Sequence, residues 1–269
     1  MEKSASIFRF KKFNVMNERS AMKVNTDGVL LGAVMTLLPQ DRRLLDVGTG
    51  TGTIALMAAQ RLAEGFQAEP GMMGKMPEMI EPEQEKAQGG FRIEAIDIDE
   101  PSATEASVNF RNSPWGQYMS VTRASLEEYA ADLEEEVRYD LIFSNPPYFD
   151  DSLEAPQERR NNARHTGSGL SYRELMEFSA RRLTEEGRFA IVLPADQERA
   201  LTRHARMCGL HLFRMTRVRT VPRKAPGRII AEFSRHRCDT PQDTVLTIQD
   251  EGKYTQEYLS LTRDFYLFA

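Results

Sequence analysis

The sequence LLDVGTGTGTIAL, residues 44–56, determines the expected fold. A short apolar run ends in an acid and is followed by three glycines at alternate positions, after which apolar residues recur at helical spacing. This order is typical of a buried strand, a tight turn and a helix that crosses back over the sheet. In open α/β sheets such turns lie outside the carboxyl ends of the strands, where ligands bind. We therefore expect a ligand site at this turn.

Strands and helices alternate on both sides of the glycine turn. We expect strands over residues 43–47, 91–97, 119–124, 139–144 and 188–193. Helices are expected over residues 27–38, 53–63, 101–111, 171–183 and 195–208. A final antiparallel pair is expected over residues 210–220 and 228–234. This alternation predicts an α/β fold with an open, mostly parallel, doubly wound sheet and an antiparallel C-terminal edge.

Capping residues set several of the expected helix boundaries. Thr26 is expected to cap the first helix and Pro39 to stop it. Asp99 is expected to cap the helix over 101–111, and Ser171 with Glu174 forms a capping box.

The size and composition fit one globular domain, which we expect to span residues 1–269. With 41% hydrophobic and 28% charged residues the chain can bury a sizeable core, which excludes a wholly disordered, collagen-like or coiled-coil protein. Residues 64–90 break the alternation, because they contain five Gly, three Pro and four Met without a helical or strand period. We interpret them as a flexible insertion. A Met-rich loop that binds a partner is the alternative.

The sequence shows no signal for export, for a membrane or for a metal. No apolar run is long enough to span a bilayer, and the first residues, MEKSASIFRFKKFN, lack an apolar signal segment. Cys208 and Cys238 are too few for a disulfide framework and are not spaced as zinc ligands. We therefore expect a cytoplasmic protein with no membrane association and no metal.

The net charge of −5 is unevenly distributed. Residues 199–237 contain eleven Arg or Lys and one acidic residue, and the first 23 residues contain six basic and two acidic groups. Local positive charge of this density favours a polyanionic partner. The alternative is a solvated basic face that binds no partner.

The glycine turn differs from the two common phosphate-binding loops. A nicotinamide-binding loop needs its third glycine where Thr53 stands, and a P-loop needs a lysine that is absent here. Asp46, two residues before the first glycine, suits a ligand with an ammonium group and would repel a pyrophosphate. The combination resembles the first motif of class I S-adenosylmethionine-dependent methyltransferases. The resemblance implies a Rossmann-like methyltransferase fold with S-adenosylmethionine held by Asp46, Gly48, Gly50 and Gly52.

The strand expected over 91–97 ends in Asp97, which is placed to accept bonds from both hydroxyl groups of a ribose. We therefore expect Asp97 to bind the same cofactor. Asp99 and Glu100 are close rivals, but Asp99 is already expected to act as a helix cap.

The most specific motif is Asn145-Pro146-Pro147-Tyr148, directly after the strand expected over 139–144. The prolines fix the backbone and remove two donors, so that carbonyl groups of the turn and of Asn145 can accept bonds from a planar amine. Tyr148 offers a ring on which a base can stack. The motif resembles the catalytic motif of amino-methyltransferases, which act on adenine N6, cytosine N4, guanine N2 or a glutamine amide. By this resemblance the four residues are catalytic and Asn145 also borders the cofactor.

Both ends of the chain resemble the family of tRNA adenine-N6-methyltransferases that modify adenine 37 of valine tRNA. The similar strings are AMKVNTDGVLLGA over residues 21–33 and YTQEYLSLTRDFYLF over residues 254–268. The resemblance implies that residues 1–40 form an extension over the cofactor site, in which Lys23, Thr26 and Asp27 line the cofactor side.

One position departs from the pattern of such enzymes. After the third expected strand they usually place an Asp that accepts a bond from the adenine amine of the cofactor, and this chain has Ser125 there. A serine hydroxyl can accept only one weaker bond. We therefore expect Ser125 to bind the cofactor less strongly, or another group to serve.

The family resemblance implies transfer of a methyl group from S-adenosylmethionine to N6 of adenine 37 in tRNA. We expect a monomer that holds the tRNA backbone through Arg160, Arg164, Arg217, Arg219, Arg223, Lys224 and Arg228. Three alternatives stay open at this point. They are a glutamine-amide methyltransferase acting on a release factor, a guanine-N2 rRNA methyltransferase and a non-catalytic RNA-binding protein. A release-factor enzyme would not need the positive charge of residues 199–237.

Overall fold

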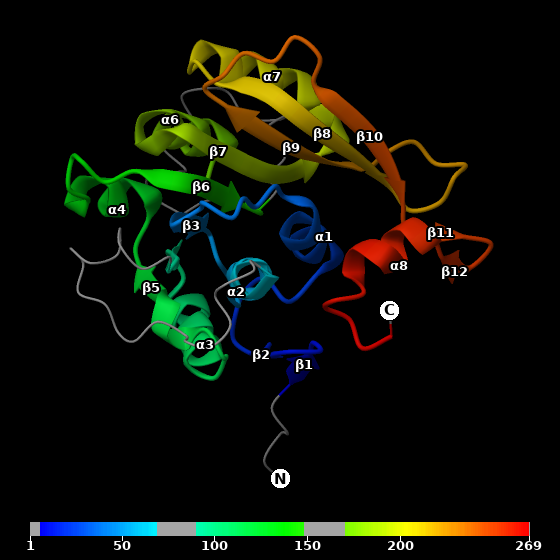
Figure 1. Cartoon of the computed structure of the whole chain (residues 1–269), viewed down its shortest axis with the longest axis horizontal. Coiled ribbons are helices and arrows are strands. Elements are labelled where there is room, and N and C mark those ends of the chain that lie inside the picture. Colours follow the sequence, from blue (N-terminus) through cyan, green and yellow to red (C-terminus); the bar gives the residue numbers. More distant parts are fainter. Residues whose placement is uncertain (1–5, 69–89, 148–169, 269) are drawn as a thin grey trace.

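The computed structural model describes residues 6–68, 90–147 and 170–268, and its centre is an eight-stranded sheet (Figure 1). The strands lie in the order β10-β8-β9-β7-β6-β3-β4-β5. In this sheet β9 runs antiparallel to both of its neighbours, and the other neighbouring pairs are parallel. Their bounds are β3 (Arg43–Val47), β4 (Arg92–Asp97), β5 (Met119–Arg123), β6 (Tyr139–Ser144), β7 (Leu183–Pro194), β8 (His211–Arg219), β9 (Arg228–Ser234) and β10 (Gln242–Thr247).

Helices cover both faces of the sheet, which confirms the predicted doubly wound α/β fold (Figure 1). One face carries α1 (Thr26–Val34), α2 (Thr53–Ala68), α3 (Glu100–Arg111) and α8 (Gln256–Thr262). The other carries α4 (Leu126–Asp132), α6 (Tyr172–Arg182) and α7 (Glu198–Met207). A hydrophobic core lies on each face of the sheet, the first under α1, α2, α3 and α8 and the second under α4, α6 and α7. Neighbouring residues of β3 contribute to both, since Leu44 packs in the first core and Leu45 in the second. A strand buried on both faces needs the continuous apolar run that the sequence shows.

The edge of the sheet differs from the prediction. The pair β8 and β9 is antiparallel as expected, but it is not the last, because β10 adds parallel to β8 outside it. Only Leu246 and Thr247 of β10 are buried. An edge strand with so few buried positions lacks the apolar pattern by which strands are recognised.

Both ends of α1 also differ from the prediction. Asn25, not Thr26, caps α1, because the Asn25 side chain accepts a hydrogen bond from Gly28 N–H at 2.8 Å. The helix ends at Val34 rather than near Leu38. At its actual end, Arg61 donates to the carbonyl groups of Gly32 (2.8 Å) and Met35 (2.9 Å). These bonds supply donors that a longer helix would have provided itself.

The helix α2 continues five residues beyond its expected end, to Ala68. Glu64 on this added turn pairs with Lys12 of the N-terminal segment at 2.6 Å. The start of the predicted insertion over 64–90 is therefore helical, and residues 69–89 lie outside the described part of the chain. The other caps are confirmed: Asp99 accepts from Ser102 N–H at the start of α3, and Ser171 with Glu174 forms the capping box of α6.

The two ends of the chain meet on the side of the first core (Figure 1). The N-terminal strands β1 (Ile7–Arg9) and β2 (Asn14–Met16) form a hairpin, and β11 (Gln249–Asp250) pairs with β12 (Lys253–Tyr254) before α8. Phe10 forms a backbone bridge with Tyr266, and their rings stack at 5.9 Å. Short 3-10 turns complete the elements, η1 (Gly116–Tyr118) and η2 (Ala195–Gln197). In the described residues, no helix has the length and apolar character needed to cross a membrane.

Candidate functional site

The glycine turn between β3 and α2 has the backbone that its sequence requires. Gly48, Gly50 and Gly52 all have positive φ angles, of 72°, 56° and 80°. Side chains rarely adopt this left-handed region. At Gly52 a Cβ atom would also lie 2.5 Å from the ring of Phe110, so helix α3 packs directly against the turn. The N–H groups of Gly48 and Thr49 donate to the carbonyl of Ile96, which fixes the turn to the end of β4.

Asp46 is fully buried beneath this turn. Its Oδ2 accepts a bond from the Thr49 hydroxyl at 2.7 Å, while its Oδ1 has no hydrogen-bond partner in the described part of the chain. Burial raises the pKa of Asp46 to about 7, against the opposing effect of the bond from Thr49. A buried oxygen without a donor is costly. An ammonium group on a ligand would supply that donor and favour the ionised carboxylate, so the residues fit the amino-acid end of S-adenosylmethionine.

Asp97 joins the glycine turn to the end of β4. Its Oδ2 accepts from Gly50 N–H at 2.8 Å and its Oδ1 from Asp99 N–H at 2.9 Å. Burial raises the pKa of Asp97, and these two backbone bonds oppose the rise. A carboxylate oxygen has two acceptor sites, so each can still accept one more donor such as a ribose hydroxyl.

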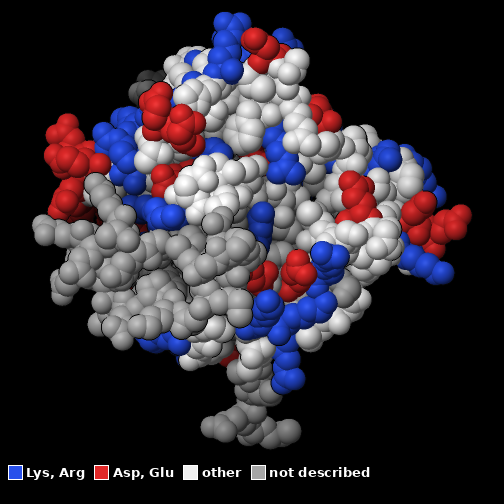
Figure 2. Space-filling model, in the orientation of Figure 1, with Lys and Arg blue, Asp and Glu red and all other residues white. Residues whose placement is uncertain are grey.

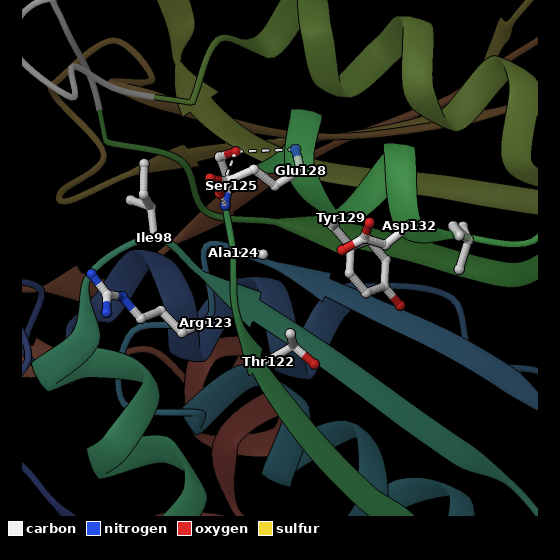
Figure 3. Close-up of a pocket in the computed structure, with 9 residues that line it drawn as sticks. Ile98, Thr122, Arg123, Ala124, Ser125, Glu128, Tyr129 and Asp132 are labelled. Atoms are coloured by element: carbon white, nitrogen blue, oxygen red, sulfur yellow. Dashed lines mark hydrogen bonds between the residues drawn. The ribbon is translucent and has the colours of Figure 1, made fainter.

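A hollow of about 600 Å³ opens beside Asp97, between the loop after β4 and helix α4 (Figure 3). In Figure 3 Ile98 stands across from Tyr129 and Asp132, with Ala124 and Ser125 between them. Ile98 is 55% exposed, so its apolar side chain is available to pack on a flat ring. The exposed side chain of Ile98 suits the flat face of a base attached to a ribose on Asp97.

Ser125 lies in the wall of this hollow, but its hydroxyl is already engaged. It caps α4 by accepting from Glu128 N–H at 3.1 Å, and it donates to Glu128 Oε2 at 2.8 Å. The helix α4 was not predicted, although Ser125 and Glu128 have the spacing of a capping box. Ser125 therefore has a structural role beside the cofactor contact that the resemblance implied, and that contact stays a prediction.

Asn145 lies next to the glycine turn. It directly follows β6, and the hydroxyl of Ser144 donates to the carbonyl of Val47 at 2.7 Å, which holds the ends of β6 and β3 together. The side chain of Asn145 is only 5% exposed, and its Nδ2 donates to the sulfur of Met22 at 3.5 Å. Pro146 is buried and Pro147 half-buried, while Tyr148 lies outside the described residues.

Part of the N-terminal segment lies beside the glycine turn, whereas its predicted role as a cover of the cofactor site stays a prediction. An added Cβ at Gly50 would lie 3.4 Å from the Ser20 hydroxyl and 3.5 Å from the carbonyl oxygen of Met22. Lys23 is exposed, and its ammonium group donates to the carbonyl of Glu18 within the same segment.

The start of α1 faces Asn145. An added Cβ at Gly28 would lie 3.6 Å from the Asn145 amide nitrogen. Thr26 is exposed and begins α1, while Asp27 forms an ion pair with Arg228 of β9 at 2.9 Å. The structure therefore brings Thr26 and Asp27 to the carboxyl edge of the sheet.

Glu105 is a site residue that the sequence analysis missed. It is 3% exposed on α3, and its carboxylate accepts three consecutive backbone N–H groups, from Glu18 (2.7 Å), Arg19 (3.0 Å) and Ser20 (2.9 Å). The only sequence signal was an acid on the inner face of a helix, and that signal does not identify a partner 85 residues away. This carboxylate anchors the extension to the fold.

The basic residues expected to hold RNA occupy different environments. Arg217 contacts Glu198 at 2.8 Å and Asp243 at 2.9 Å, so two carboxylates already neutralise its charge. Arg219 donates to Thr247, and Arg228 pairs with Asp27. Figure 2 shows positive and negative side chains interspersed over the face that it draws.

Arg223 and Lys224 are exposed in the loop between β8 and β9. This loop lies at the carboxyl edge of the sheet, because Ala195, directly after β7, donates its N–H to the carbonyl of Gly227 at 3.2 Å. Arg160 and Arg164 lie outside the described residues. In the part of the chain that the structure covers, no group of three His, Cys, Asp or Glu side chains could hold a metal ion.

The chain resembles known methyltransferases in sequence and in fold. A family model described as RMKL-like, methyltransferase domain, matches residues 33–224. A tRNA1(Val) (adenine(37)-N6)-methyltransferase of Parabacteroides distasonis is 40% identical over 97% of both chains. One of Bacteroides fragilis is 36% identical over 98% of this chain and 99% of its own. A solved structure described as a predicted O-methyltransferase of Agrobacterium tumefaciens has a TM-score of 0.58 and 14% identity, over 89% of this chain and 96% of its own.

Proposed function

Because the chain belongs to the tRNA1(Val) (adenine(37)-N6)-methyltransferase family, we propose that it transfers a methyl group from S-adenosylmethionine to N6 of adenine 37 in valine tRNA. The observation that carries this proposal is similarity over 97% of the chain to relatives of that name. The buried Asn145 beside the glycine turn supports it, since it places an amide acceptor next to the ligand site.

S-adenosylmethionine supplies an electrophilic methyl group on a sulfonium. Asp46 would bind its ammonium group, because the unpartnered Oδ1 of this buried carboxyl lacks a donor. Asp97 would accept bonds from the ribose hydroxyls, and the hollow beside Ile98 would receive the base. Gly48, Gly50 and Gly52 allow the backbone to approach the ligand closely.

Asn145 acts on the target amine through hydrogen bonds. The lone pair of an exocyclic amine on adenine is delocalised into the ring, so the amine is a weak nucleophile. Acceptors on both N–H groups favour the pyramidal amine geometry that develops in the transition state. The site would therefore bind the transition state more tightly than the ground state. The amide oxygen of Asn145 and a carbonyl of the turn with Pro146 and Pro147 would provide these acceptors, and the ring of Tyr148 would stack on the adenine. The proton can leave to solvent after transfer, so no general base is required.

The RNA reaches this site at the carboxyl edge of the sheet. An adenine in a folded RNA must be splayed out of its stack to enter such a site, and a nucleotide beside the anticodon is already partly unstacked. The exposed loop with Arg223 and Lys224 lies at this edge and would bind the RNA backbone. Arg217 contributes less than the sequence suggested, because Glu198 and Asp243 already neutralise it.

We further propose that the protein acts as a monomer of one domain in the cytoplasm, where its tRNA substrate is found. Arg160 and Arg164, which lie outside the described residues, would also bind the RNA backbone. Ser125 and Glu128 both line the hollow, and either would accept the cofactor's adenine amine.

The direct test is methylation of unmodified valine tRNA by the purified protein with labelled S-adenosylmethionine, followed by nucleoside analysis. We expect N6-methyladenosine, and no product from a control tRNA in which adenine 37 is replaced by guanine. Methylation of a release-factor glutamine or formation of N2-methylguanosine would overturn the proposal in favour of those enzyme classes. No transfer to any of the three would favour a non-catalytic RNA-binding protein.

A further inference from the structure

The Arg and Lys residues of the basic stretch over 199–237 differ in their contacts. Most of them pair with carboxylates or donate to hydroxyl and carbonyl oxygens. The others form no hydrogen bond or ion pair within the part of the chain that the structure describes. Two of these are Arg223 and Lys224 in the loop after β8. The other three lie on α7 and form what we call the α7 face: Arg199, Arg203 and Arg206.

The α7 face is exposed and carries one sign of charge. Its three arginines share one side of the helix, because residues three and four positions apart are neighbours on a helix surface. Leu201 and Ala205, on the other side, are fully buried in the second core. The only acid of α7 is Glu198, and its carboxylate contacts Arg217 at 2.8 Å. No acid of this helix is therefore left to neutralise the α7 face.

This charge pattern lowers the stability of α7. Like charges three and four residues apart repel one another, and Arg199 in the first turn lies at the positive end of the helix dipole. The neighbouring α6 lacks such a bias, since its exposed residues include Arg173 and Arg181 together with glutamates. A bound polyanion would offset the repulsion on α7. The α7 face therefore has the character of a surface for a negatively charged partner.

The α7 face begins at the edge of the sheet where Asn145 lies. Helix α7 follows β7 through the short turn η2, and β7 pairs in parallel with β6, which Asn145 follows. At this edge the N–H of Ala195 donates to the carbonyl of Gly227 in the loop with Arg223 and Lys224. From there α7 runs back over β8 and β9, and its arginines span about 10 Å along the helix axis (Figure 1). An RNA backbone that leaves the edge can therefore follow the α7 face.

We propose that the α7 face binds phosphate groups of the tRNA stem next to the loop that carries the target adenine. The inference rests on the proposed methylation of tRNA and adds a second surface to it, because the loop with Arg223 and Lys224 lies at the edge itself. The backbone on either side of a nucleotide in a hairpin loop leads into the stem of the hairpin. Guanidinium groups bind phosphates through paired hydrogen bonds and stay charged at every physiological pH. Phosphate contacts position an RNA without reading its bases, so the α7 face favours a loop that has a stem over a single strand of the same loop sequence.

The test measures the binding of two RNAs to variants of the full chain. One RNA is a hairpin with the anticodon stem and loop of valine tRNA, and the other is a single strand with the sequence of the loop alone. The Gln variant combines Arg199→Gln, Arg203→Gln and Arg206→Gln. The Lys variant combines Arg199→Lys, Arg203→Lys and Arg206→Lys, which keeps the charges. The matched control removes three exposed charges before β5, before β6 and after β9, at the opposite edge of the sheet, and combines Arg111→Gln, Arg138→Gln and Arg237→Gln.

We expect the Gln variant to bind the hairpin more weakly than the unchanged protein. Its affinity should also fall roughly 20- to 40-fold less between about 50 and 200 mM salt, because three phosphate contacts are lost. Binding of the single strand, kcat at saturating tRNA and the Kd of S-adenosylhomocysteine should not change. The Lys variant and the matched control should bind the hairpin like the unchanged protein, since an ammonium group also binds phosphate.

Two results would overturn the inference: hairpin binding with unchanged affinity and salt dependence in the Gln variant, or an equal loss of affinity for both RNAs. An equal loss in the matched control would also overturn it, because net charge alone would then explain the effect. If the Gln variant does not fold, the three single Arg→Gln variants decide, and each should reduce the salt slope of hairpin binding by roughly 0.7–0.9. Failure of the unchanged protein to make N6-methyladenosine would instead refute the proposed function.

Discussion

The anchoring of the N-terminal extension by Glu105 can be tested by Glu105→Gln. The carboxylate accepts the N–H of Glu18 and Arg19 on Oε1 and the N–H of Ser20 on Oε2. An amide of the same shape keeps one oxygen, so it can still serve Glu18 and Arg19. Its NH2 group would then face the N–H of Ser20, and two donors would meet in a site that is 3% exposed.

The size of the effect follows from the bonds lost. A hydrogen bond to a charged group contributes about 1.5–3 kcal/mol, and the variant loses one such bond and weakens two others. The free energy needed to open residues 18–20 should therefore fall by about 1.5–3 kcal/mol. This fall increases the population of the open segment by roughly 10- to 150-fold. Because the closed segment lies on Gly50, affinity for S-adenosylhomocysteine should fall by no more than that factor.

Hydrogen exchange of the backbone amides measures this opening directly. We expect faster exchange confined to residues 18–20, with no change in β3 and β6, together with weaker binding of S-adenosylhomocysteine in calorimetry. The matched control for the exchange measurement is Glu100→Gln on the same helix, whose carboxylate is exposed and pairs only with Arg123 among the contacts described. Unchanged exchange at residues 18–20 would refute the reasoning. Faster exchange throughout the sheet would also refute it, because that result means global destabilisation.

Three further predictions address the site. Asn145→Ala should abolish methyl transfer and leave the Kd of S-adenosylhomocysteine nearly unchanged, since Asn145 faces the amine; a collapse of binding in calorimetry would contradict this role. Affinity for S-adenosylhomocysteine should fall as pH drops below 7, because the buried Asp46 has a pKa of about 7 and must be ionised to bind an ammonium group. Because the pKa of Asp46 is raised in the folded protein, its ionisation lowers the free energy of unfolding as pH rises from the unfolded pKa through 7. Asp46→Asn should remove this loss of stability, so it should raise Tm at pH 8 but not at pH 4. The opposite change in Tm would refute the assignment. Reversing the charges of Arg223 and Lys224 should raise KM for tRNA and reduce the salt slope of binding by roughly 0.7–0.9 per lost contact, with cofactor affinity as the internal control; an unaltered slope would favour a solvated basic face.

The sequence by itself determined the central sheet and the residues at its carboxyl edge. The strand before Gly48 had to be buried on both faces, because Leu44 and Leu45 are adjacent and apolar. Three alternate glycines predicted a tight turn, and in the structure all three have the positive φ that other residues rarely adopt. Asp97 and Asn145 were located by their places in the strand pattern: Asp97 ends one strand and Asn145 directly follows another strand of the same parallel part of the sheet, so both must lie at one edge.

Only the tertiary structure decided which side chains meet at that edge. The partners of Glu105 lie 85 to 87 positions away, and Met22 is 123 positions from Asn145, so no local pattern could connect them. From the sequence, Arg217 was expected to bind the RNA backbone, but in the structure it pairs with Glu198 and Asp243. Local backbone preference and apolar period specify elements, whereas contacts between distant segments depend on how those elements pack. The sequence could therefore place the glycine turn and Asn145 at one edge of the sheet, but it could not identify the distant side chains that contact them.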